Sequence, residues 1–174
     1  MAKTNKMGLT IQQVSQAGEL LVASEINLHG AYAAQFSGNM PGIDLVAIDV
    51  PRTRLVGIQV KTRTSGQGWQ INTRRGQARE PNPDETVYWV FVDLATPPAE
   101  YYGVPEWWAE NAIHERNVWY LSQHGGQRPV NPKSTHGLLV QPQLAEWMDK
   151  WEELRIFPEK EATTAPTPTA LALA

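Results

Sequence analysis

The sequence of 174 residues contains no cysteine. This absence excludes a disulfide framework and any metal site built on thiolates, and it agrees with a reducing compartment. No apolar run reaches the ~18 residues that span a membrane, and the N-terminal stretch MAKTNKMGLTIQQ has no apolar core of signal-peptide length. The four histidines lack the spacing of metal ligands. We therefore expect a soluble, cytoplasmic protein with no membrane partner.

Charge is unevenly distributed along the chain, although the net charge is only −3. Residues 1–80 hold nine lysines or arginines and five acids, whereas residues 81–174 hold six basic and thirteen acidic residues. A basic half beside an acidic half is a hint of a polyanionic partner on one face. Chance unevenness explains the same numbers and stays open at this point.

Length and composition fit one globular domain with a sizeable core. Hydrophobic residues make up 41% of the chain and charged residues 19%, which is ordinary for a globular protein. We expect a single domain over residues 1–157. The remaining segment, PEKEATTAPTPTALALA, is rich in Pro, Thr and Ala, which predicts a disordered tail over residues 158–174.

The hydrophobic pattern predicts a mixed β-sheet flanked by helices, of α/β or α+β class, in the order α-β-β-β-(β)-β-β-α-α. The expected helices span residues 11–28, 105–121 and 141–155, the first beginning with a capping box of Thr10 and Gln13. The expected strands span residues 31–36, 43–50, 54–61, 68–72, 86–94 and 100–104. Two of them are almost continuously apolar, which predicts a sheet covered on both faces.

Three polar residues stand at the ends of the apolar runs in PGIDLVAIDVPRTRLVGIQVKT. A turn centred on Arg52 and Thr53 would place Asp44 directly opposite Lys61, with Gln59 on the same face. Such a cluster suits phosphodiester hydrolysis, because carboxylate and amide oxygens are hard ligands for Mg²⁺ and an ammonium can hold water or neutralise developing charge. A plain Asp–Lys pair at a strand end, with Gln59 as a bystander, is the simpler alternative.

The order of the motifs GELL, PGID and QVK resembles the PD-(D/E)XK nuclease superfamily. The resemblance covers residues 10–95 and is greatest to the variant that carries Gln-x-Lys, which includes some homing endonucleases. It implies a restriction-endonuclease-like fold and a metal-dependent endodeoxyribonuclease. Mg²⁺ would be the cofactor, with Mn²⁺ able to substitute. The products would be a 5′-phosphate and a 3′-hydroxyl, and dimers or tetramers are expected from the same resemblance.

The resemblance also implies a role for each residue of the candidate site. Asp44, Gln59 and the Val60 carbonyl would hold the metal, and Glu19 would contact the metal or its water. Lys61 would assist the attacking water or stabilise the transition state. Gln59 stands where most members have an acid, and the lost charge should weaken affinity for a divalent cation. A catalytically degenerate DNA-binding or assembly protein therefore stays open.

The segment KTRTSGQGWQINTRRGQARE follows the site motif directly and is expected to bind DNA. Its candidate contacts are Arg63, Arg74, Arg75 and Arg79 to phosphates, and Trp69 to a base. Packing in the core is the alternative for Trp69. A third hypothesis is an interaction module whose Trp-rich C-terminal helices bind a partner.

Overall fold

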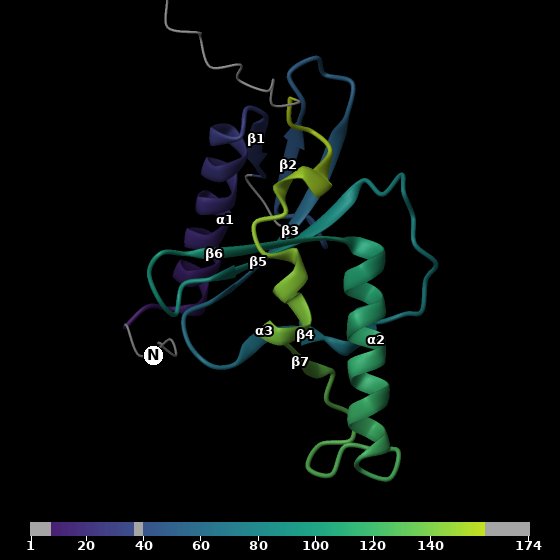
Figure 1. Cartoon of the computed structure of the whole chain (residues 1–174). Coiled ribbons are helices and arrows are strands. Elements are labelled where there is room, and N and C mark those ends of the chain that lie inside the picture. Colours follow the sequence, from purple (N-terminus) through teal and green to yellow (C-terminus); the bar gives the residue numbers. More distant parts are fainter. Residues whose placement is uncertain (1–7, 37–39, 159–174) are drawn as a thin grey trace, which may run out of the picture.

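A five-stranded sheet forms the centre of the computed structural model, which describes residues 8–36 and 40–158 (Figure 1). In spatial order its strands are β1 (Tyr32–Gln35), β2 (Leu45–Ile48), β3 (Leu55–Arg63), β5 (Val87–Asp93) and β6 (Glu100–Pro105). Strands β3 and β5 are parallel, and the other neighbouring pairs are antiparallel. The predicted mixed sheet is confirmed, whereas the predicted tail lies, from residue 159 on, outside the described residues.

Helix α1 (Ile11–Leu28) covers one face of the sheet. It begins as predicted, because the Thr10 hydroxyl accepts a hydrogen bond from the Gln13 amide at 3.2 Å and the Gln13 side chain accepts one from the Thr10 amide at 2.8 Å. Val22 and Ile26 lie fully buried against the sheet. Burial of this apolar face attaches the helix to β3 and β2.

Gly18 marks the closest approach of α1 to β3. A Cβ atom at this position would lie 1.8 Å from the Thr62 hydroxyl oxygen, so no larger residue fits unless the two elements move apart. The following residue, Glu19, is therefore carried on a helix that is fixed close to the end of β3.

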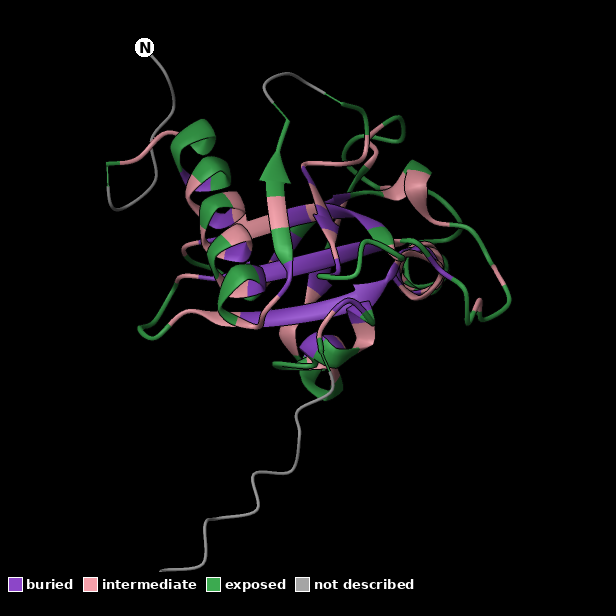
Figure 2. Ribbon diagram, turned by 90° about the horizontal axis from the view of Figure 1, so that it is seen from above, coloured by how far each residue is buried: buried purple, intermediate pink, exposed green. Residues whose placement is uncertain are grey.

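The other face of the sheet is covered by helix α2 (Glu106–Ser122) and by a small antiparallel sheet of β4 (Gly68–Asn72) and β7 (His136–Val140). The ring of Trp69 packs edge-on against Phe91 and Tyr102, with centroids 5.6 and 5.5 Å away. Each face thus has its own buried cluster, and Figure 2 shows how burial concentrates on the central strands. The prediction of a sheet covered on both faces is confirmed.

The prediction of one helix over residues 141–155 is wrong. The chain forms strand β7 and then three short turns, α3 (Gln141–Leu144), η2 (Ala145–Trp147) and η3 (Trp151–Leu154). Trp147 packs against Trp108 on the α2 face, while Trp151 packs against Tyr101 in the cluster on the α1 face. A straight helix on one face of the sheet could not supply both contacts. The segment instead crosses β6, where the Asp149 amide donates to the Tyr101 carbonyl at 2.9 Å.

Candidate metal and nucleic-acid site

The β2–β3 hairpin differs from the expected one by two residues. Leu45 lies opposite Ile58, and the same register continued by one position places Asp44 opposite Gln59 rather than Lys61. The prediction of a direct Asp44–Lys61 pair is wrong for this reason. A shift of two residues preserves the alternation of the strand, so Gln59 and Lys61 keep their common face.

The shift arises in the loop of residues 49–54, which is longer than a two-residue turn. The carboxylate of Asp49 accepts hydrogen bonds from the Thr53 amide at 2.8 Å and the Arg54 amide at 3.0 Å. These bonds lower the pKa of Asp49 below its ordinary value, with the bond from Arg54 as the largest cause. A side chain therefore closes the loop, and this closure sets the register of the strands that carry the candidate site.

Asp44 is fixed at the start of β2 by two bonds to β3. Its amide donates to the Ile58 carbonyl at 2.8 Å, and its Oδ2 accepts from the Val60 amide at 2.6 Å. The carboxylate is thus held at the point where β2 and β3 begin to separate, next to the backbone of Val60.

Gln59 lies opposite Asp44 with its side-chain oxygen buried and unbonded. Among the described residues, none donates a hydrogen bond to Gln59 Oε1. An unsatisfied buried acceptor costs about 1–3 kcal/mol, and a bound cation is one partner that would offset this cost. An oxygen in this condition, beside a carboxylate, fits a hard divalent cation.

Lys61 lies on the same face, over the ring of Trp89 on β5, with Nζ 5.8 Å from the ring centroid. Burial lowers the pKa of Lys61 below its ordinary value, and the positive charge of Arg75 lowers it further. The negative charges of Asp44 and Glu19 act in the opposite direction. Lys61 is therefore a cation whose proton is held less tightly than that of a surface lysine.

Glu19 reaches this group from α1. Burial raises the pKa of Glu19, and the negative charge of Asp44 raises it further. A hydrogen bond from Gln35 Nε2 at 3.3 Å and the charge of Lys61 lower it in part. The charges of Asp44 and Lys61 thus act on Glu19, and the charges of Asp44 and Glu19 act on Lys61.

The donor set fits a hard metal ion through mixed ligands rather than through a cluster of acids. Within residues 8–36 and 40–158, no three His, Asp or Glu side chains form a group that could hold a metal by themselves. The available oxygens are the carboxylates of Asp44 and Glu19, the buried amide oxygen of Gln59 and the carbonyl of Val60. Carboxylate, amide and carbonyl oxygens are the ligand types that Mg²⁺ accepts.

Two of the residues expected to bind DNA lie in the interior instead. Arg63 is 7% exposed, forms an ion pair with Asp93, and donates to the carbonyl of Gly66 at 3.0 Å. Its guanidinium also stacks on the ring of Trp69, 4.3 Å from the centroid. Trp69 is 1% exposed, and its indole N–H donates to the Val92 carbonyl at 2.9 Å. Both are corrected to core residues, because burial and internal partners leave no surface for a phosphate or a base.

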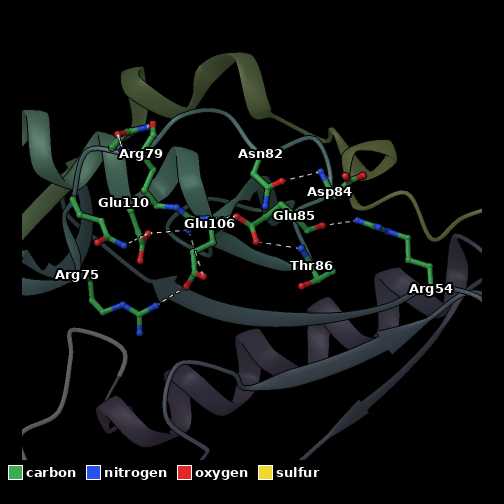
Figure 3. Close-up of polar contacts among 11 residues, drawn as sticks. Arg54, Arg75, Arg79, Asn82, Asp84, Glu85, Thr86, Glu106 and Glu110 are labelled. Atoms are coloured by element: carbon green, nitrogen blue, oxygen red, sulfur yellow. Dashed lines mark hydrogen bonds and ion pairs between the residues drawn. The ribbon is translucent and has the colours of Figure 1, made fainter.

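The remaining arginines of the segment lie nearer the surface, but two of them are paired with acids (Figure 3). Arg75 binds Glu106 at 2.6 Å, and Arg79 binds Glu85 at 3.1 Å and Glu110 at 3.0 Å. The hydrogen bond that Arg79 donates to Glu110 is the largest cause that raises the pKa of Arg79. The third arginine, Arg74, is exposed.

Trp89 and Glu106 belong to the site region although no sequence motif points to them. Trp89 pairs with Gln59 across the parallel β3–β5 ladder, and its ring carries both Lys61 and Arg75, the latter 5.4 Å from the centroid. The only signal in the sequence is that TVYWVFVDL is a strong strand. Its pairing beside β3 depends on the sheet order, which local patterns do not specify.

The architecture is similar to that of a solved structure described as a bacterial homing endonuclease, I-Ssp6803I. The two share 13% identity, the match covers 84% of this chain and 95% of the other, and the TM-score is 0.51. The chain has the restriction-endonuclease-like fold. This is the fold of the PD-(D/E)XK nucleases, as the motif order predicts.

A second match is Hjc, a Holliday junction resolvase from Archaeoglobus fulgidus. It shares 15% identity and a TM-score of 0.42, with 76% of this chain and 88% of the other covered. No protein-family model and no curated protein matches the sequence. No helix among the described residues has both the length and the apolar character needed to cross a bilayer. The restriction-endonuclease-like fold therefore rests on three-dimensional similarity.

Proposed function

We propose that the protein is a Mg²⁺-dependent endodeoxyribonuclease of the Gln-x-Lys type, with Mn²⁺ able to substitute for Mg²⁺. The observation that carries the proposal is the buried, unbonded oxygen of Gln59. Gln59 lies opposite Asp44, next to the end of the β2–β3 pairing. Asp44, Gln59, the Val60 carbonyl and Glu19 would hold the metal. When bound, the metal supplies polarisation of the phosphate and a lowered pKa for the attacking water.

The chain's own residues orient and balance the charges of the reaction. The bond from the Val60 amide fixes the Asp44 carboxylate, so little reorganisation is needed when a phosphate arrives. Lys61, with its lowered pKa, is suited to hold the water and to exchange a proton with it. Water attacks phosphorus, the bond to the 3′-oxygen breaks, and a 5′-phosphate and a 3′-hydroxyl result.

Cleavage of supercoiled plasmid in Mg²⁺ or Mn²⁺ tests the proposal. We expect Asp44→Ala and Lys61→Ala to lower the cleavage rate by about 10²-fold or more, the scale of losing one charged group from a transition state. Asp84→Ala and Lys150→Ala remove the same charges at exposed positions and should leave the rate unchanged. Equal cleavage by all five proteins would contradict the assignment of the site.

A nuclease-fold protein that binds DNA without cleaving it is the second candidate, and Gln59 is the observation that favours it. The neutral amide removes one negative charge that a metal would otherwise meet. This candidate predicts salt-sensitive DNA binding that survives Asp44→Ala and no turnover with either metal. Calorimetric titration of Mn²⁺ into Gln59→Glu should show tighter binding than the wild type if position 59 is a ligand.

A further inference from the structure

A cavity of about 280 Å³ lies between the second half of α2 and the small sheet of β4 and β7. Its polar lining comes from Thr73, Arg116, Asn117, Tyr120, Arg128 and His136, and we call it the distal basic cavity. No carboxylate is among its lining residues, and no residue of the candidate metal site is among them either.

The arginines of the distal basic cavity have aromatic neighbours in place of acidic ones. Arg116 lies 4.4 Å from the ring centroid of Trp119, and Arg128 lies 5.0 Å from that of Tyr120. Among the described residues, neither forms an ion pair. Arg128 donates to Asn117 Oδ1 at 3.2 Å, which uses one of the five N–H groups of a guanidinium. Two cations without a counter-ion in one cavity favour an anion with several acceptor oxygens.

The aromatic surface beside the cavity favours a nucleic acid over a small inorganic anion. Trp119 is 51% exposed although it is a large apolar residue. The ring of Tyr120 stacks on His124 with centroids 4.4 Å apart and planes 27° apart. Flat rings interleaved with arginines match the alternation of bases and phosphates, and stacking of this kind is worth about 1–3 kcal/mol per base.

A short segment connects the cavity to the candidate metal site. The 3₁₀ turn η1 (Thr73–Arg75) begins with Thr73 in the cavity wall and ends with Arg75 over Trp89, the ring that also carries Lys61. Arg74, between them, is exposed. Three residues of such a turn advance about 6 Å. The backbone of η1 therefore leads in one short turn from the wall of the distal basic cavity to an arginine beside the candidate metal site.

We propose that the distal basic cavity binds a backbone phosphate of the DNA flanking the cleavage site, with Arg116 and Arg128 as the phosphate ligands. The choice of DNA rests on the proposed function. The cavity supplies a positive surface for the phosphate. Arg75 and Arg79, in the segment after the QVK motif, do not, because each is paired with an acid. It would hold the register of the duplex without reading its sequence.

Fluorescence polarisation of a labelled DNA duplex at several salt concentrations, in EDTA, tests the cavity without requiring cleavage. We expect Arg116→Gln/Arg128→Gln to weaken binding on the order of tenfold. The slope of log affinity against log salt should become less steep by about 0.9, the value for one lost phosphate contact. Arg52→Gln/Lys150→Gln removes the same charge from exposed positions outside the cavity and should leave the slope nearly unchanged.

Arg116→Lys/Arg128→Lys separates a phosphate contact from a structural role, because it keeps both charges. We expect this variant to retain most of the salt slope. An unchanged slope in the glutamine variant, an equal change in the control variant, or equal loss in the lysine variant would overturn the proposal. Tighter, cavity-dependent binding of an RNA duplex would overturn the assignment to DNA.

The cavity and the nuclease activity can fail separately in these measurements. A protein that binds DNA through Arg116 and Arg128 but never cleaves it would support the cavity and contradict the nuclease. A protein that cleaves plasmid at a rate dependent on Asp44, with an unchanged salt slope in the glutamine variant, would do the reverse.

Discussion

The two halves of helix α2 surround arginines in different ways. In the first half, Glu106 binds Arg75 at 2.6 Å and Glu110 binds Arg79 at 3.0 Å. Glu110 is buried and also accepts from the Gln77 side chain at 2.8 Å, so this carboxylate is fully engaged within the fold. Arginines beside the first half therefore serve the packing of the segment that joins β4 to β5.

Beside the second half of α2, Arg116 of the helix and Arg128 of the following loop lie against aromatic rings. Within the described part of the chain, neither forms an ion pair with a carboxylate. The comparison shows why a count of basic residues misjudges a binding surface. Only a cation without an internal partner keeps its full charge for a phosphate.

Ion pairs inside the fold account for much of the uneven charge of the sequence. Arg63, Arg75 and Arg79 belong to the basic first 80 residues, and each pairs with an acid from the acidic remainder. Much of the asymmetry is thus neutralised inside the fold. The arginines of the distal basic cavity come from the acidic remainder of the sequence, so the charge distribution along the chain does not indicate a binding site there.

Replacement of Arg79 should have the largest effect on stability. Arg79→Ala leaves the buried carboxylates of Glu85 and Glu110 without their cation, which we expect to lower the free energy of unfolding by about 2 kcal/mol. Arg116→Ala removes an arginine of α2 that has no acidic partner, and it should change the free energy of unfolding by less than about 0.5 kcal/mol. Urea denaturation measures both, and similar losses in the two variants would remove the distinction.

Lys61 differs from the paired arginines and from the arginines of the distal basic cavity, because it is a half-buried cation whose charge the fold disfavours. We expect Lys61→Met to raise the free energy of unfolding at neutral pH by about 1 kcal/mol while cleavage is lost. Folding lowers the pKa of Lys61 from 10.5, so the wild type gains stability as pH rises from the lowered value towards 10.5. The advantage of Lys61→Met in urea denaturation should therefore shrink with rising pH, and an advantage that grew would contradict it.

Glu106→Gln should have the smallest effect of these changes, and it concerns DNA affinity. The substitution removes the acidic partner of Arg75 and leaves every cation in place. Freed from the carboxylate at 2.6 Å, Arg75 could contact a phosphate near the candidate metal site. We expect DNA affinity to rise a few fold and the salt slope to steepen by about 0.9. Polarisation measurements on Glu115→Gln, an exposed acid of the same helix, supply the control. A rise of equal size there would indicate a general effect of net charge.

Local sequence patterns predicted a helix or strand well where the residues that define it lie within its own segment. Helix α1 has the expected bounds because its cap and apolar face lie within its own sequence. The segment 141–155 was expected to be helical from its periodicity, but its tryptophans belong to two different clusters. Tertiary packing overrode the helical pattern there, since each indole contributes more by burial than the helix gains from propensity.

The order of motifs along the chain predicts the fold, and it predicts that Glu19, Asp44, Gln59 and Lys61 lie near one another. The common face of Gln59 and Lys61 is kept because a register shift of two residues preserves the alternation of side chains along a strand. Only the tertiary structure decided which residue faces Asp44, since the Asp49 loop sets the register. Tertiary structure alone also decided which arginines remain unpaired, because their acids lie far away in the sequence. Long-range pairing depends on sheet order and helix placement, and no local pattern carries that information.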